Sequence, residues 1–366
     1  MVCRRFMNKM EPLKEKPLAV SAASAEIPSA SITRSGFVGI IGRPNVGKST
    51  LLNEILGEKL AIASPRPQTT RERLLGVVTK GQSQFAFVDT PGLHRPSGRG
   101  RTLLNQFMYE ESRQVLADVD VVLLVSDLRG LRKEERDAPL VNPSSILDPG
   151  DRYIAEQLPK DKPVILALNK ADLLSDKRWL LPFLEAWQSV YPFQVMVPIS
   201  ALTGQGVSQL VEELQNRLPS GGEIFPQDTL TDRSERFLVA ERIREQVFLA
   251  THQEVPYAVA VTVDAWEERI AEKGPKIGKR LGVRIDATVH VEKSAQKRIL
   301  VGQRGQMVKD IGSIAREEIK QLLGCGVQLF LFVRVDENWS ETQRGLREMG
   351  YSSTQTLGQT LEKGTQ

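Results

Sequence analysis

The sequence contains few residues of the types that build metal centres or disulfide frameworks. Its 366 residues include two cysteines, Cys3 and Cys325, and three histidines, at positions 94, 252 and 290. Two distant cysteines indicate neither a disulfide framework nor a zinc site, and scattered histidines do not suggest a histidine-based metal centre. Such sparse cysteine is typical of a reducing compartment.

Long apolar runs and a strong charge of one sign are also missing. No apolar stretch reaches the roughly 18 residues that a transmembrane helix needs, so none is predicted. The formal net charge is only +4, with 40% hydrophobic and 26% charged residues, which is ordinary for a globular protein. The length favours two domains with tails.

The first 34 residues are predicted to be a disordered N-terminal extension. They are rich in small and polar residues that cannot bury a core. A basic, serine-rich transit peptide is the alternative, but Glu11, Glu15 and Glu26 argue against it. A start codon placed too early would leave the same pattern.

Residues 35–218 alternate apolar runs with helical patterns. The runs lie at 37–41, 85–88, 119–125, 163–168 and 194–199. This alternation predicts an α/β fold with a mostly parallel, doubly wound sheet. Ligands of such sheets bind at the carboxyl ends of the strands, so motifs that follow the runs are candidate site residues.

The first of these motifs is a phosphate-binding loop between a predicted strand and a predicted helix. The pattern G-x-x-x-x-G-K-[ST] is matched by Gly42, Arg43, Pro44, Asn45, Val46, Gly47, Lys48 and Ser49, and Thr50 follows. Its backbone N–H groups and the helix N-terminus would cradle phosphates. Lys48 is expected to reach the β- and γ-phosphates, and the Ser49 hydroxyl to bind Mg²⁺.

The second motif is D-x-x-G at the end of the run 85–88. It is formed by Asp89, Thr90, Pro91 and Gly92, with Leu93 next. Asp89 is expected to hold Mg²⁺ through water, and the Gly92 N–H to sense the γ-phosphate. Leu93 stands where many Ras-like enzymes have a glutamine that orients water, so slow intrinsic turnover is expected.

Two more segments predict which nucleotide base is bound and which loop responds to the γ-phosphate. Asn169, Lys170, Ala171 and Asp172 match N-K-x-D, whose carboxylate accepts hydrogen bonds from guanine but not from adenine; Ser200 and Ala201 follow the next run. In the polar stretch 64–71, Thr70 is predicted to contact Mg²⁺ and the γ-phosphate, with Thr69 as the alternative. Lys48, Thr70, Asp89 and Gly92 are therefore the candidate catalytic residues.

These motifs, in this order, resemble those of the Era family of translation-factor-related GTPases. The sequences of Gly42–Ser49 and Pro67–Arg71 are similar to the corresponding motifs of that family. Relatives of this group also lack the catalytic glutamine, and some use K⁺, which the resemblance places near Asn45. The connection after Asp127 is longer than in most such chains and is interpreted as a solvated loop insertion around residues 131–150.

A linker at 219–234 and a second domain at 235–338 are predicted next. The second domain has the order αββααβ, with Gly302, Gln303, Arg304 and Gly305 between two helices. This order and loop resemble a type II KH domain, in which a G-x-x-G loop clamps single-stranded RNA. From Lys273 to Lys309 there are ten Lys or Arg against two acidic residues, and the candidate RNA contacts include Lys293, Lys297, Arg298 and Lys309. A helix–helix turn and a solvated basic face are the alternatives. Residues 339–366 are interpreted as a polar tail.

The resemblance implies a function as well as a fold. It implies hydrolysis of GTP to GDP with Mg²⁺, binding of 16S rRNA near its 3′ end, and a role in 30S subunit biogenesis by a cytoplasmic monomer without a DNA partner. The alternatives are a regulatory GTPase that docks on a protein or on the inner face of the cell membrane, and an RNA-binding protein that no longer hydrolyses GTP.

Overall fold

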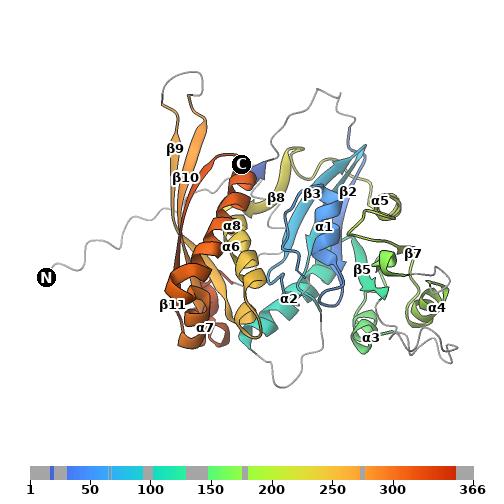
Figure 1. Cartoon of the computed structure of the whole chain (residues 1–366). Helices are drawn as coiled ribbons and strands as arrows, with labels where there is room; N and C mark the ends of the chain where they lie inside the picture. The colour runs from blue at the N-terminus through green and yellow to red at the C-terminus, as the bar shows by residue number, and fades with distance from the viewer. Residues whose placement is uncertain are drawn as a thin grey trace.

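The computed structural model describes most of the chain in two packed parts. It describes residues 17–19, 31–64, 66, 68–93, 102–128, 147–174, 180–272 and 277–351. Within these ranges every helix is too short or too polar to cross a lipid bilayer. Figure 1 shows the larger sheet with helices around it and a second, smaller sheet at the left, with further helices between the two sheets.

The first part is built on a six-stranded sheet in the order β3-β4-β2-β5-β6-β7. Its strands are β2 (Arg34–Ile41), β3 (Leu74–Lys80), β4 (Ser83–Asp89), β5 (Val121–Asp127), β6 (Val164–Asn169) and β7 (Val195–Pro198). All neighbouring pairs are parallel except β3 with β4. The predicted doubly wound, mostly parallel sheet is confirmed, and the antiparallel edge strand β3 is an addition to the prediction.

Helices cover both faces of this sheet because the strands are apolar on both sides. The helices are α1 (Lys48–Leu56), α2 (Leu103–Asp118), α3 (Pro149–Glu156), α4 (Leu180–Val190) and α5 (Val207–Gln215). Helices α1 and α5 pack on one face, while α2, α3 and α4 pack on the other. This arrangement leaves the loops at the carboxyl ends of the strands free to form a site.

The second part has the predicted order αββααβ. Its elements are α6 (Glu235–Ala250), β9 (Ala260–Ile270), β10 (Arg280–Val291), α7 (Ser294–Val301), α8 (Gln306–Leu323) and β11 (Gly326–Val335), with short 3-10 turns η5 (Val255–Ala258) and η6 (Gln303–Gly305). The sheet order is β11-β10-β9, with β10 and β11 parallel. Figure 1 shows α6 and α8 between this sheet and the first part.

The segment between the two parts is more ordered than a turn-rich linker. It contains β8 (Thr229–Ser234), which pairs antiparallel with β1 (Pro17–Ala19) of the N-terminal extension. The remaining extension before residue 31 lies outside the described residues. Residues 31–34 lead into β2, and the Thr33 N–H donates to the Gln82 carbonyl. The predicted disordered extension is therefore wrong at β1 and at its end.

The prediction of a polar tail from residue 339 is wrong as far as Tyr351. Residues Trp339–Glu341 form η7 and Gln343–Glu348 form α9. Trp339 is 1% exposed and packs with Leu346 and Met349 against Leu104 and Met108 of α2. This small core joins the end of the chain to the first part. Residues 352–366 lie outside the described residues.

Candidate functional site

The phosphate-binding loop lies between β2 and α1, in the conformation that an anion site requires. Asn45 and Gly47 have φ values of 66° and 100°, so successive N–H groups turn toward the same side. A Cβ on Gly47 would lie 2.2 Å from the Asn169 amide nitrogen. Helix α1 begins at Lys48 without a side-chain cap, which leaves its first N–H groups and its positive end to a ligand.

Lys48 is buried at the centre of this loop. Its ammonium group donates to the Gly42 carbonyl at 3.1 Å and to the Arg43 carbonyl at 3.0 Å. Burial lowers the pKa of Lys48 to about 8, although the nearby Asp89 carboxylate acts in the opposite direction. The geometry holds this cation where the loop turns, ready to pair with phosphate oxygens.

Three oxygen-bearing side chains meet beside the loop. The Ser49 hydroxyl donates to Asp89 Oδ2 at 2.7 Å and lies 3.0 Å from the Thr70 hydroxyl, which itself donates to Asp89 Oδ2 at 3.2 Å. Burial raises the pKa of Asp89, and its Oδ1 has no hydrogen-bond partner among the described residues. Two hydroxyls and a buried, incompletely paired carboxylate are the hard oxygen donors that Mg²⁺ prefers.

This cluster also separates the two candidate threonines. The Thr70 hydroxyl belongs to it, whereas the Thr69 carbonyl accepts a hydrogen bond from Arg244 of α6. Thr70 therefore lies with Ser49 and Asp89 in what we call the candidate metal corner. Thr69 contributes a contact between the two parts of the molecule.

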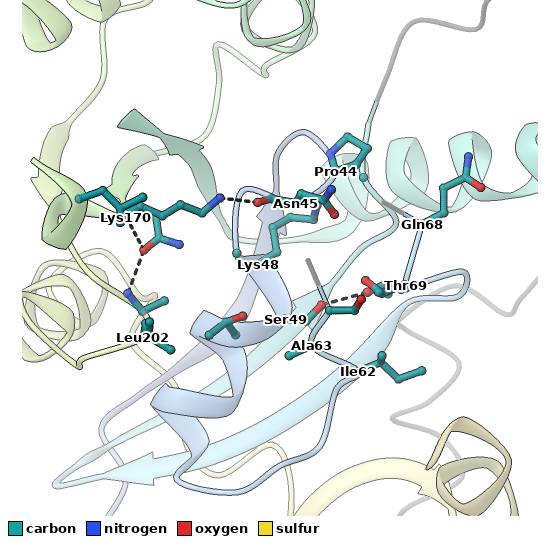
Figure 2. Close-up of a pocket in the computed structure, with 18 of the residues that line it drawn as sticks. Pro44, Asn45, Lys48, Ser49, Ile62, Ala63, Gln68, Thr69, Lys170 and Leu202 are labelled. Carbon is teal, nitrogen blue, oxygen red and sulfur yellow. Dashed lines mark hydrogen bonds between the residues drawn. The ribbon is translucent and has the colours of Figure 1, made fainter. Parts of the chain in front are cut away.

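The predicted guanine motif faces the other end of the loop. Asn169 donates from Nδ2 to the Val46 carbonyl at 2.8 Å, and its Oδ1 accepts from the N–H groups of Lys170 and Ala201, both at 2.8 Å. Lys170 donates to the Asn45 carbonyl at 2.6 Å (Figure 2). Asn169 and Lys170 thereby tie the N-K-x-D motif to the phosphate loop, and Ala201 is joined to Asn169. Asp172 is exposed at the edge of the same cavity.

A single cavity of about 420 Å³ connects these features. The predicted residues that line it, including the alternative Thr69, are Pro44, Asn45, Gly47, Lys48, Ser49, Thr50, Thr69, Thr70, Gly92, Asn169, Lys170, Asp172 and Ala201. Sequence reasoning missed several others, namely Ile62, Ala63, Ser64, Gln68, Leu173 and Leu202. Figure 2 shows Ile62, Ala63 and Thr69 on the segment that closes the cavity opposite Asn45 and Lys170.

The other predicted site residues do not line this cavity. They are Gly42, Arg43, Val46, Asp89, Thr90, Pro91, Leu93, Ala171 and Ser200. Leu93 is 3% exposed and belongs to the core between the sheet and α2, while its N–H donates to the Gly42 carbonyl at 3.1 Å. The Arg43 side chain points to three carboxylates instead of the cavity.

Beside Thr70, Arg71 crosses from the first part into the second. It is 2% exposed, and its guanidinium donates to the carbonyls of Val259 at 2.5 Å, Tyr257 at 2.9 Å and Pro256 at 3.2 Å. It also donates to the Tyr351 hydroxyl at 3.3 Å. Backbone carbonyls of the second part therefore hold the residue that follows Thr70.

Two further arginines strengthen this contact. Arg66 donates to the carbonyls of Phe248 and Thr251, and Arg244, 1% exposed, reaches back to the Thr69 carbonyl. Lys59 adds a more exposed bridge, with Glu245 at 2.9 Å and Glu318 at 3.0 Å. The segment that closes the cavity is thus anchored mainly to α6 and the turn after it.

The G-x-x-G loop forms a second candidate site, on the surface of the second part. Gly302, Arg304 and Gly305 have φ values of 70°, 50° and 78°, and a Cβ on Gly302 would meet Met307 at 2.7 Å. The predicted cations around the loop are all exposed, and none forms an ion pair with another described residue: Lys293, Lys297, Arg298, Arg304 and Lys309. Lys273 and Lys276 of the basic stretch lie outside the described residues.

Comparisons with known proteins agree with both sites. A family described as 50S ribosome-binding GTPase matches residues 37–170, and a KH domain family matches residues 254–340. GTPase Era of Syntrophus aciditrophicus (strain SB) is 45% identical over 320 residues, covering 87% of this chain and 95% of the relative. GTPase Era of Geobacter sp. (strain M21) is 46% identical, covering 87% and 98%.

Two solved structures have the same arrangement. One is Era in complex with MgGDPNP and nucleotides 1506–1542 of 16S ribosomal RNA, with a TM-score of 0.76, 35% identity and coverage of 87% of this chain and 99% of that one. The other is Aquifex aeolicus Era Y63A bound to GDP·AlF4⁻, with a TM-score of 0.75 and the same identity and coverage. Because each match covers 87% of this chain, it extends over both parts of the molecule.

Proposed function

Because the chain belongs to the Era family of GTPases, we propose that it couples GTP hydrolysis to the binding of 16S ribosomal RNA near its 3′ end, in the biogenesis of the 30S subunit. The chain is a GTPase with a KH domain, and its nucleotide is GTP or GDP with Mg²⁺. The proposed domains are the G domain (35–218), the linker (219–234) and the KH domain (235–338). To these we add the C-terminal residues 339–351.

In the proposed reaction, each part of the cavity handles one part of the nucleotide. The loop N–H groups and Lys48 bind the phosphates, while Ser49, Thr70 and Asp89 hold Mg²⁺, which neutralises charge that develops on the transferred phosphoryl group. Gly92 lies against Pro44, where a Cβ would come within 2.7 Å of the Pro44 nitrogen, so its N–H can approach a γ-phosphate. Asp172 accepts hydrogen bonds from guanine.

Water positioning has to come from elsewhere than Leu93. Its side chain is buried in the core and carries no polar group. Asn45 lines the cavity and is the residue through which K⁺ would act, as the family resemblance implies. We therefore expect a slow intrinsic rate that depends on the monovalent cation.

One observation carries the coupling between GTP and RNA. Thr70 belongs to the metal corner, and its two neighbours, Thr69 and Arg71, are bonded to the KH domain. If Thr70 moves when phosphate is released, the residues on either side of it move as well, and their contacts with the KH domain change. Ligands shift such an equilibrium only through contacts that differ between states, and Thr70 supplies that difference.

The RNA surface is assigned to the loop Gly302–Gly305 and the exposed cations around it. Positive φ angles let the backbone approach a sugar–phosphate chain, and Ile299, 47% exposed, offers an apolar contact beside Gly302. These lysines and arginines form no ion pair with another described residue, so they are available to phosphates. The family resemblance implies a cytoplasmic monomer; the alternative of peripheral membrane contact predicts binding to anionic vesicles without RNA.

The test is RNA affinity in the two nucleotide states. A labelled oligoribonucleotide of the 16S rRNA 3′ end should bind the full chain with affinities that differ between GDPNP and GDP, as measured by anisotropy. A scrambled RNA of equal length is the control. Equal affinities in both states would refute the coupling, and no preference over the scrambled RNA would refute the assigned partner.

A further inference from the structure

The side chain of Arg43 is held by three carboxylates that come from beyond the phosphate loop. Its Nε lies 2.9 Å from Asp151, its Nη1 3.3 Å from Asp148 and its Nη2 3.4 Å from Asp127. None of the four residues lines the nucleotide cavity. A guanidinium presents several donors in a rigid plane, so these contacts fix its orientation.

One of the carboxylates closes a ring of contacts around the loop. Asp127, at the end of β5, also accepts from Lys170 Nζ at 2.6 Å, and Lys170 donates in turn to the Asn45 carbonyl at 2.6 Å. Arg43 and Asn45 are two residues apart in the loop. Asp127 therefore links Arg43 to Lys170 of the predicted guanine motif. Through this link the loop is held at two positions, the Arg43 side chain and the Asn45 carbonyl.

The second carboxylate is buried. Asp151 is 2% exposed and accepts from the Ser126 hydroxyl at 3.0 Å, and burial raises its pKa while Arg43 acts in the opposite direction. The backbone there leaves no spare room, because a Cβ on Gly150 would lie 2.8 Å from Arg43 Cδ. Buried ion pairs contribute little net stability compared with apolar residues, so this one needs another explanation.

We propose that Arg43 is a positioning residue that sets nucleotide affinity by holding the phosphate loop in its binding conformation. The Arg43 carbonyl itself accepts from Lys48 at 3.0 Å, so the same residue links the carboxylates to the phosphate-binding lysine. GDP and GTP share the phosphates that the loop cradles, so Arg43 acts equally on both. The inference rests on the proposed nucleotide site.

These contacts also involve the end of the long connection between β5 and α3. The connection re-enters the described structure at Leu147, which is 4% exposed, and Asp148 then caps α3 by accepting from the Gly150 N–H at 2.7 Å. Of the predicted solvated insertion around residues 131–150, only residues 147–150 are described; Leu147 is buried and Pro149 is exposed. Residues 147–150 tie α3 to the phosphate loop through Arg43.

The experiment measures GDP and GTP affinity, the hydrolysis rate at saturating GTP, and thermal stability of the full chain. In Arg43→Gln both nucleotides should bind about tenfold more weakly, which corresponds to about 1.4 kcal/mol. The saturated rate should stay within about twofold, because the chemical groups at Thr70 and Asp89 are unchanged. Arg217→Gln is the matched control, since it removes a one-carboxylate pair with Glu213 on α5.

A second variant separates positioning from stability. Arg43→Gln leaves Asp151 as an unpaired buried charge, whereas Arg43→Gln with Asp151→Asn removes both charges and should recover thermal stability. If Arg43 positions the loop, the double variant still binds both nucleotides weakly. Affinity that returns together with stability, or an unchanged affinity in Arg43→Gln, would overturn the inference. Failure of the unaltered chain to bind GTP would instead refute the proposed function.

Discussion

Replacing Arg71 by methionine should loosen the KH domain from the G domain. Methionine keeps an apolar side chain of similar length but has no hydrogen-bond donors. The buried carbonyls of Pro256, Tyr257 and Val259 therefore lose their charged hydrogen-bond donor. One hydrogen bond to a charged group contributes about 1.5–3 kcal/mol, but such values do not add. Breaking a buried charged network typically costs about 3–5 kcal/mol, which is the loss expected here.

Calorimetry of the full chain checks this magnitude. A loss of that size should lower the unfolding midpoint by about 5–10 °C and separate the G-domain and KH-domain transitions, because the lost contacts lie between them. Lys59→Met is the matched control: Lys59 is 47% exposed, and Glu245 keeps its Arg242 contact at 3.3 Å. Exposed pairs contribute about 0–1 kcal/mol.

The same variant tests the coupling. In Arg71→Met the difference in RNA affinity between the GDPNP and GDP states should shrink, whereas Lys59→Met should keep it. A single transition with a midpoint within about 1 °C of the unaltered protein would show that the contacts do not hold the domains together. An unchanged affinity difference would show that they do not transmit the nucleotide state.

Three further predictions concern the base, the RNA loop and the cation. Asp172→Asn should weaken GTP binding by about 100-fold or more in competition with labelled GDP, because a carboxylate that accepts two hydrogen bonds is replaced by an amide; a loss below about threefold would contradict the assigned role. Gly302→Asp with Gly305→Asp should reduce RNA affinity about tenfold or more and leave GTP hydrolysis unchanged, since side chains and negative charge enter the backbone clamp; undiminished RNA binding would remove the loop from the interface. Hydrolysis should be faster in KCl than in NaCl, and equal rates would exclude K⁺ at Asn45.

The sequence is sufficient to predict the parts of the molecule that depend on local patterns. The phosphate loop needs glycines, a lysine and a helix start at fixed spacing, and the KH order depends on hydrophobic periodicity. The edge strand β3 could have been recognised as well, because the apolar run Leu74–Val78 leads into a turn at Gly81 before β4. It was not predicted because it closely follows the polar stretch 64–71, which was interpreted as a loop.

Contacts between distant segments were not predictable in the same way. Arg71 and Arg244 are most simply interpreted from sequence as solvated cations, yet both are almost fully buried. Trp339 follows a strand in a polar stretch, and only its size indicates a core position. Arg71 and Trp339 donate to backbone carbonyls more than 80 residues away, at Val259 and Ala258. Arg244 reaches the distant Thr69 carbonyl in addition to its ion pair with Glu241 on the same helix. Periodicity carries no information about such partners.

The formal net charge of +4 includes two groups of cationic side chains with different roles. Arg66, Arg71 and Arg244 donate hydrogen bonds to backbone carbonyls at the domain contact. The cations around Gly302–Gly305 are exposed and have no ion-pair partner among the described residues. Since added salt screens exposed charges far more than buried ones, it should weaken RNA binding steeply while leaving the domain contact intact. The nucleotide state and the ionic strength therefore act on RNA affinity through separate residues.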